Sequence, residues 1–206
     1  MRFSFQKLAL ALLCGCLPLA AQAESQFSTG TASPLTASAR VDFQITIPKT
    51  LFLRVGTGTA QESNATVNLI DFVVPAASVG VGTPIAATAA SGDLGNGTVT
   101  ARVQGNNGNI TLTSSTAGAL LNGEGDSIGY SQISTAATVL SSATALPAPS
   151  LADGSTNTVT IPAVSKIVNR DAQWTYSYLN TAVVAPGTYG GVNSNNSRVT
   201  YTASMP

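Results

Sequence analysis

The feature that most constrains the fold is a strict alternation of residue types near the C-terminus. From Gln173 to Leu179, large aromatic residues occupy every second position, with Thr or Ser between them. A period of two places successive side chains on opposite faces of an extended chain, which predicts a β-strand. The aromatic face consists of Trp174, Tyr176 and Tyr178. We expect it to pack in a hydrophobic core; an exposed platform that binds sugars is the alternative.

A second alternating stretch, Arg198 to Ala203, comes after a loop rich in Gly and Asn. Loops of this composition supply the turns between strands. We predict that this stretch closes a sheet, and that Val199, Tyr201 and Ala203 share one face of the closing strand.

Residues 1–23 have the pattern of a secretory signal peptide. Arg2 and Lys7 precede an apolar run, which is followed by the small-residue cleavage pattern Ala21-Gln22-Ala23. The apolar run is too short to cross a bilayer as a helix. We therefore predict an exported protein of the periplasm, cell surface or extracellular space, with no transmembrane segment, whose mature chain begins at Glu24.

Both cysteines of the chain, Cys14 and Cys16, fall inside this predicted signal peptide. The mature protein would therefore have no disulfide, and its stability would come from its core. An alternative interpretation is that Leu13-Cys14-Gly15-Cys16 is a lipobox. In that case Cys16 would be lipidated and would become the N-terminus.

The charge content excludes one class of partner and favours one fold class. Only 9% of the residues are charged, and loss of Arg2 and Lys7 from nine basic residues would leave seven against nine acidic ones. A nucleic-acid-binding protein needs a basic face to displace counterions from phosphates, so we expect no nucleic-acid partner. The residues that build amphipathic helices are scarce, which favours an all-β protein.

The N-terminal part of the mature chain divides into two stretches. Residues 24–38 are small and polar and are predicted to form a flexible arm. Residues 39–47 alternate regularly and predict a half-buried strand, which Pro48 ends. This strand would open a single domain spanning residues 39–206. Its apolar face consists of Ala39, Val41, Phe43, Ile45 and Ile47.

Further strands are predicted along the rest of the chain, at 51–55, 66–74, 98–104, 109–113, 158–164 and, more weakly, 128–133. The pair 98–104 and 109–113 is expected to form a hairpin, and Pro162 marks its strand as an edge. We expect loops at 76–97, with room for a short edge strand, and at 134–153. The spacing of these strands favours one antiparallel β-sandwich, immunoglobulin-like or pilin-like.

The sequence offers little for catalysis. It has no His, and the predicted mature chain has no Cys, which excludes Ser-His-Asp and Cys-His nucleophiles and the usual zinc ligand sets. Glu124 and Asp126 flank Gly125 in a stretch that could wrap calcium, but we expect a tight polar turn because further acids are absent there. We predict no enzyme, no catalytic residue, no cofactor and no metal.

Several of these stretches resemble one group of proteins. The run Pro186 to Gly191, followed by Arg198 to Thr202, resembles the G-x-Y turn and final strand of exported pilin-like domains, those of spore coat protein U and of archaic chaperone-usher pili. The phrases Val41 to Pro48 and Trp174 to Tyr178 are similar to stretches in a set of exported bacterial proteins. The chain departs from many pilin-like subunits in lacking their cysteine pair.

The resemblance implies a bacterial surface subunit, pilus-like or from a matrix, that is completed by a strand from a neighbour. The donor strand would be residues 39–47, and the partners would be copies of the chain, related subunits and a periplasmic chaperone. From the residues alone, the alternative is that this strand pairs within its own domain. A monomeric secreted adhesin or carbohydrate-binding module, which would bind through the loops at 76–97 and 120–125, is the second function class.

Overall fold

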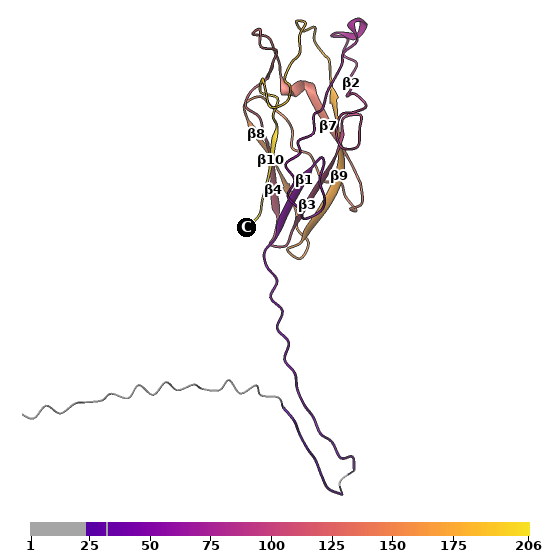
Figure 1. Ribbon diagram of the computed structural model, residues 1–206, viewed down its shortest axis with the longest axis vertical. Helices are drawn as coiled ribbons and strands as arrows, with labels where there is room; N and C mark the ends of the chain where they lie inside the picture. The colour runs from indigo at the N-terminus through magenta and orange to yellow at the C-terminus, as the bar shows by residue number, and fades with distance from the viewer. Residues whose placement is uncertain (1–23, 32) are drawn as a thin grey trace, which may run out of the picture. The chain divides into compact units, whose positions relative to one another are not determined.

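The computed structural model describes residues 24–31 and 33–206, and the compact domain runs from Pro48 to Pro206 (Figure 1). Its regular structure is nearly all β. The strands are β1 (Leu51–Val55), β2 (Ile85–Ala86), β3 (Thr98–Gly105), β4 (Ile110–Ser115), β5 (Leu120–Leu121), β6 (Ser127–Ile128), β7 (Ile133–Thr138), β8 (Thr156–Ile161), β9 (Val168–Tyr178) and β10 (Thr200–Ser204), with short 3-10 turns at Ala76–Ser78 and Tyr130–Gln132.

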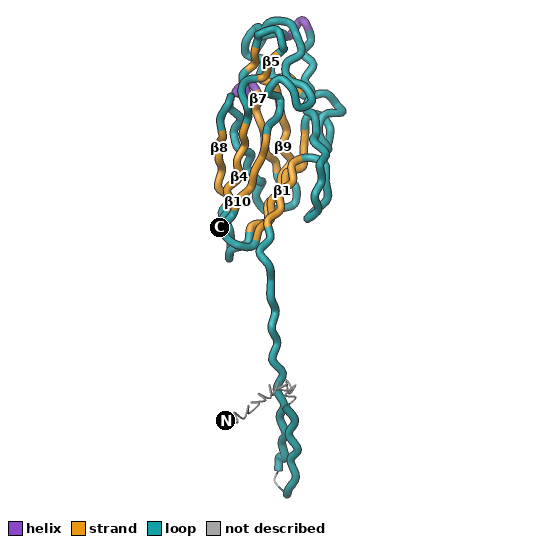
Figure 2. Tube along the Cα trace, turned by 60° about the vertical axis from the view of Figure 1, so that its left-hand side comes forward, coloured by secondary structure: helices purple, strands orange, loops and turns teal. Residues whose placement is uncertain are grey.

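The strands form two larger sheets and a small hairpin, in which every pairing is antiparallel. A five-stranded sheet has the order β1-β3-β9-β2, and β7 also pairs with β9; a three-stranded sheet has the order β10-β4-β8, and β5 pairs with β6. The apolar faces of the two larger sheets share one core, which makes the domain a β-sandwich (Figure 2). The predicted all-β fold is confirmed.

The core lies where the aromatic alternation places it. Trp174 is 0% exposed, Tyr176 is 7% exposed and Tyr178 is 5% exposed. The Trp174 Nε1 donates a hydrogen bond to the Leu146 carbonyl at 2.8 Å, so the one polar group of the indole is satisfied inside the core. The core interpretation of this face is confirmed, and the sugar-platform alternative is wrong because the ring surfaces are covered.

The predicted hairpin of β3 and β4 is wrong. The turn at residues 106–109 does join the two strands, but it carries the chain from one sheet to the other: β3 pairs with β1 and β9, whereas β4 pairs with β10 and β8. Alternation fixes which face of each strand is apolar but not which strand lies beside it.

The other boundaries differ in part from the sequence prediction. Residues 66–74 form no strand. They still alternate between partly buried and exposed side chains: Ile70 and Phe72 pack on the core, whereas Val67 is 60% exposed and Val73 is 65% exposed. The predicted loop at 134–153 contains most of β7, and the weak strand predicted at 128–133 reduces to the last residue of β6 and the first of β7.

The 76–97 region contains the short strand β2, which pairs with the end of β9. The strand predicted at 158–164 corresponds to β8, which ends at Ile161, just before Pro162; it is confirmed as an edge, because β8 pairs only with β4.

Candidate functional site

The predicted donor strand, residues 39–47, is unpaired in the structure. It has no strand assignment, and its larger apolar side chains are exposed: Val41 75%, Phe43 89%, Ile45 84% and Ile47 76%. The expectation of a half-buried strand within the chain's own domain is therefore wrong. The compact domain begins at Pro48, not at the predicted Ala39. An amphipathic strand can form a ladder only beside a partner strand, and no strand of residues 24–31 and 33–206 pairs with this segment.

The described contacts of the N-terminal segment lie around its polar residues. The Arg40 guanidinium donates two hydrogen bonds to the Glu24 carboxylate, at 2.7 and 2.8 Å, and the Ser38 amide donates to the Gln26 side chain at 2.9 Å. The hydrogen bond from Arg40 holds the pKa of Glu24 below its ordinary value. None of these contacts covers the apolar face of residues 39–47, which leaves that face available to a partner.

In the compact domain, one margin of the sandwich ends in two strands with free edges. β1 pairs only with β3, and β10 pairs only with β4. The two strands lie next to each other across the margin, one from each sheet. Their outer backbone groups have no ladder partner within the part of the chain described, which is the arrangement that accepts an added strand.

The core is incompletely covered along this β1/β10 margin. Tyr201 and Ala203 of β10 point to the core, as does Leu53 of β1, yet all three remain partly exposed. One strand further in, their register partners are fully covered: Val103, opposite Leu53, and Leu112, opposite Ala203, are both 0% exposed. The loss of burial therefore sits at the margin, where β1 and β10 each have one neighbouring strand.

Val199, the third residue predicted for the closing strand, immediately precedes β10 and is also partly buried. The strand that was expected to close a sheet is an edge strand. A cavity of about 90 Å³ lies along β1, between residues 52–55 and the loop at 57–66.

The opposite margin, between β7 and β8, is bridged by the chain itself. Residues 139–152, named here the strap, connect the two edge strands, and Leu146 of the strap is 0% exposed. Its amide donates to the Asp171 carbonyl at 3.0 Å on one sheet. On the other sheet, the Ser150 carbonyl accepts from Ser114 at 2.8 Å and from Asn157 at 2.9 Å. The strap thus bridges the two sheets at the β7/β8 margin.

Asp171 anchors the strap electrostatically. Burial disfavours its ionised form, but hydrogen bonds from the amides and hydroxyls of Ser141 and Ser142 outweigh burial and lower its pKa to about 2. The amide bonds, at 2.9 and 2.8 Å, both end on one carboxylate oxygen, and the Ser141 hydroxyl donates to the other oxygen. This carboxylate is committed to holding a turn, which gives it a structural role.

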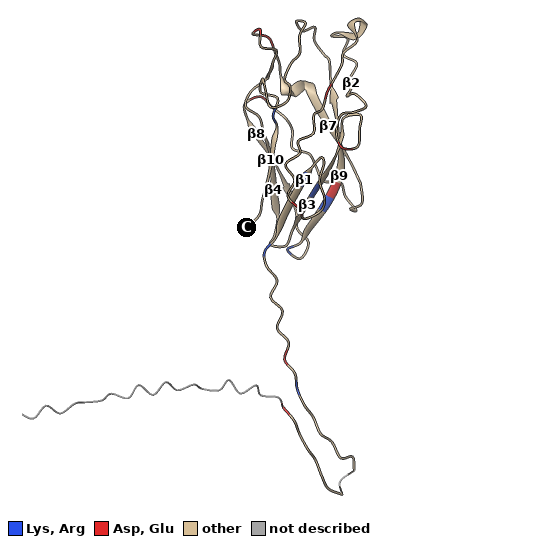
Figure 3. Ribbon diagram, in the orientation of Figure 1, with Lys and Arg blue, Asp and Glu red and all other residues tan. Residues whose placement is uncertain are grey.

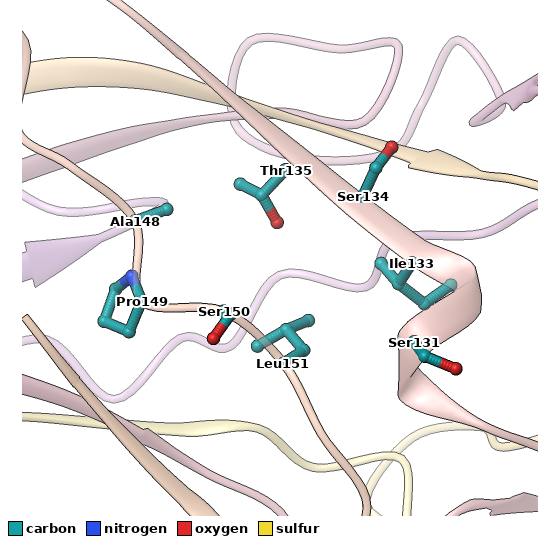
Figure 4. A pocket seen from close by; sticks show the side chains of 8 residues that line it. All are labelled: Ser131, Ile133, Ser134, Thr135, Ala148, Pro149, Ser150 and Leu151. Atoms are coloured by element: carbon teal, nitrogen blue, oxygen red, sulfur yellow. The ribbon is translucent and has the colours of Figure 1, made fainter.

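A cavity of about 320 Å³ lies between β7 and the strap (Figure 4). Figure 4 shows small hydroxyl and aliphatic side chains around it, and none of them is ionisable. Its lining consists of Ser131, Ile133, Ser134, Thr135, Ala148, Pro149, Ser150 and Leu151. Such a lining offers no general acid, general base or metal ligand set.

Glu124 and Asp126 lie in the turn of the β5–β6 hairpin. The Asn122 side-chain oxygen accepts from the amides of Glu124, at 2.8 Å, and Asp126, at 3.1 Å, and the Asn122 amide donates to the Asp126 carboxylate at 2.9 Å. This is the geometry of the tight polar turn that the sequence predicts. Within residues 24–31 and 33–206, no group of three or more His, Cys, Asp or Glu could hold a metal ion.

The comparisons with known proteins add no relatives. No family model matches the chain, and a search of curated proteins finds nothing similar. The resemblance to pilin-like domains therefore stays a prediction. The signal peptide and the alternative lipidation at Cys16 lie outside the described residues, and among the described residues no helix is long and apolar enough to cross a membrane.

The sequence suggests residues 39–47 as a donor strand and Val199, Tyr201 and Ala203 as a closing strand, and it predicts β1 as a strand without marking it as an edge. In the sequence, Leu53 and Val55 look like ordinary core positions of a short strand. Only the pairing order shows that β1 is an edge next to β10.

Proposed function

We propose that the protein is an exported, non-catalytic structural subunit of the bacterial cell surface, and that it assembles by strand pairing between copies. Residues 39–47 of one copy join the β1/β10 margin of the next. The observation that carries the proposal is the coincidence of two incomplete features in one chain. The most regular amphipathic segment pairs with no strand among the described residues, and the domain has a margin with a half-covered core.

The physical drive is the burial of apolar surface together with new backbone hydrogen bonds. Each large apolar side chain that leaves water stabilises the pairing by about 2 kcal/mol. Alternate side chains of a strand are spaced about 6.6 Å apart, both in the donor and in β10, where Tyr201 and Ala203 face the core. The two rows can therefore interleave over several positions, while the edges of β1 and β10 supply the main-chain partners.

For β10, strand direction favours pairing with a segment from another copy over pairing with the chain's own segment. Pro48 and Pro206 lie at the same end of the domain as the 106–109 turn: the Pro48 carbonyl accepts from the Asn106 side chain at 2.8 Å, and the Pro206 carbonyl accepts from Lys49 at 3.0 Å. We name this end the base. β10 runs toward the base, because Ser204 pairs with Thr111 and Thr200 pairs with Ser115.

A segment joined to Pro48 at the base can lie along its own β10 only in parallel. An antiparallel ladder with β10, which is slightly the more stable kind, needs a segment whose Ile47 end points away from the base, and only a second copy can supply it. Pairing of this kind joins different surfaces of two copies and therefore extends into an open chain of subunits.

A free margin of this kind also calls for protection before assembly. Exposed strand edges beside apolar side chains are sites of unwanted aggregation. A periplasmic chaperone that covers the β1/β10 margin until a subunit arrives is accordingly part of the proposal, and related subunits with similar donor segments could occupy the same margin.

The test uses the chain without residues 24–47 and a synthetic peptide of residues 39–47. The truncated domain should no longer assemble, and it should bind the peptide and unfold at a higher temperature in its presence, since a ligand of the folded state stabilises that state. The matched control is the same peptide with Phe43→Ser and Ile45→Ser. A truncated chain that assembles as before and ignores the peptide would refute the proposal.

Assembly of the intact protein is read from electron microscopy of sheared cell-surface material and from gels of unheated and boiled samples. Filaments that contain this chain, with a ladder of bands that collapses on boiling, are the expected result. A single monomer band without filaments would instead favour the monomeric adhesin or carbohydrate-binding module.

A further inference from the structure

The two ends of the domain carry exposed side chains of complementary character. At the base, the turn after β8 is held by two backbone hydrogen bonds between Val164 and Ile167, both 2.9 Å, and the Gly108 amide donates to the Lys166 carbonyl at 2.9 Å. This turn presents Val164, 75% exposed, and Ile167, 58% exposed, beside the positive charges of Lys166 and Lys49. Neither lysine forms an ion pair with another described residue.

The opposite end, which we name the apex, is built from three loops that are tied together. Asn180, only 1% exposed, accepts from the Gly80 amide at 2.9 Å through its side chain, and the Gly190 amide donates to the Leu121 carbonyl at 2.9 Å. Exposed valines stand on two of these loops, Val81 at 58% and Val183 at 78%.

The third loop of the apex is the turn of the β5–β6 hairpin, which carries Glu124 and Asp126. Figure 3 shows acidic residues in the loops of the apex and basic residues at the base. The two ends therefore differ: the apex presents valines and the carboxylates of the β5–β6 turn, with Arg198 just before β10, and the base presents aliphatic side chains and lysines.

We propose that the apex of one copy docks against the base of the next copy. This inference rests on the proposed strand pairing, which brings the two surfaces together. In antiparallel pairing with β10, the Ile47 end of the donor leaves the acceptor at its apex. Three residues, 48–50, separate it from β1 at the donor's own base, and three extended residues span about 10 Å.

That short connection places the lysines of the base close to the carboxylates of the apex, within the range over which charges interact at physiological salt. Val164 and Ile167 can at the same time cover Val81 and Val183, which no part of the described chain covers in the single copy. The strand links the copies, and the docked ends set the angle between them.

The first test places one cysteine at each end of the full-length chain, Lys166→Cys with Glu124→Cys, and adds a short bis-maleimide to assembled material. The sequence has no cysteine after Cys16, so in the predicted mature chain, from Glu24 on, cross-links report the introduced positions alone. The expected result is a ladder that survives boiling. Each single variant should give dimers at most, and a pair at the same end, Glu124→Cys with Val183→Cys, should give no ladder.

The outcomes separate this inference from the proposed function. A boiling-sensitive ladder without cross-links would refute end-to-end docking and leave strand pairing standing. Cross-links without a boiling-sensitive ladder would support docking and refute strand pairing, and the absence of both would refute the two together.

Charge reversal tests the chemistry of the contact. In the background of the cysteine pair Val164→Cys with Val183→Cys, Lys166→Glu should lower the cross-linking yield several-fold at low salt, and adding Glu124→Lys should restore it. Equal yields in all three proteins would show that the charges play no part and would overturn the electrostatic half of the inference.

Discussion

Replacing Phe43 and Ile45 together by serine is expected to abolish assembly while leaving the single copy as stable as before. Both side chains are exposed in the single copy, at 89% and 84%, so their removal takes nothing from the core of the domain. When the strands pair, each side chain would be buried, and replacing it by serine would weaken the free energy of pairing by about 2 kcal/mol. The sum, about 4 kcal/mol, corresponds to roughly a thousandfold weaker pairing.

The assay compares the unboiled ladder with the unfolding temperature of the monomer. The double variant should show no ladder and an unchanged unfolding temperature. The matched control is Gln44→Ser with Thr46→Ser, two changes on the opposite face of the same segment, which should keep the ladder. An intact ladder in the Phe43/Ile45 variant, or equal losses in both variants, would refute the idea that the apolar face enters an acceptor.

Three further predictions concern the domain itself. The pKa of Asp171 is lowered to about 2 in the folded protein, so its carboxylate stabilises the fold above its ordinary pKa, and this stabilisation is lost as pH falls from about 4 toward 2. Asp171→Asn should remove about 2 kcal/mol of this acid dependence, measured by denaturant unfolding at each pH. Burial raises the pKa of Tyr130 to about 12, so stability should fall as pH rises from about 10 to 12, and Tyr130→Phe should flatten that alkaline limb. Trp174→Phe should destabilise by about 3 kcal/mol in urea unfolding, because it opens space in the core and leaves the Leu146 carbonyl without its donor; a loss below about 1 kcal/mol would contradict this packing.

The parts of the fold that the sequence predicts are those encoded locally. The alternation of residues 173–179 is enough to place Trp174 in the core, because in a strand the face of a side chain depends only on its parity. The same reasoning places β1, β3, β4 and β8 within a few residues of their observed bounds. Strand pairing depends on residues far apart in sequence. The sequence therefore predicts a hairpin of β3 and β4, although the two strands lie in different sheets.

The candidate site divides in the same way. The donor segment is visible in the sequence because its pattern is complete in itself. The proposed acceptor depends on β1 and β10 being edge strands. The sequence around Leu53 and Val55 has the same apolar pattern whether or not another strand lies beside β1. The strap could not be predicted either, because Leu146 and Asp171 are 25 residues apart in sequence and are joined by a backbone hydrogen bond that no periodicity signals.

An antiparallel hairpin with their own β1 is the pairing that competes with assembly for residues 39–47, and the hydrogen bonds of Asn106 disfavour it. Its side-chain oxygen accepts from the Thr50 amide and its side-chain nitrogen donates to the Pro48 carbonyl, both at 2.8 Å. These bonds fix the residues that a hairpin would have to use as its turn, so folding back would have to break both.

At about 1 kcal/mol each, the two bonds disfavour self-pairing by about 2 kcal/mol, or roughly thirtyfold. Asn106→Ala should therefore shift material from the ladder to a monomer whose residues 39–47 resist proteolysis, whereas Asn107→Ala in the same turn should not. If Asn106→Ala keeps the full ladder and its monomer is cleaved in this segment as fast as the unchanged chain, the turn does not control the choice between the two partners.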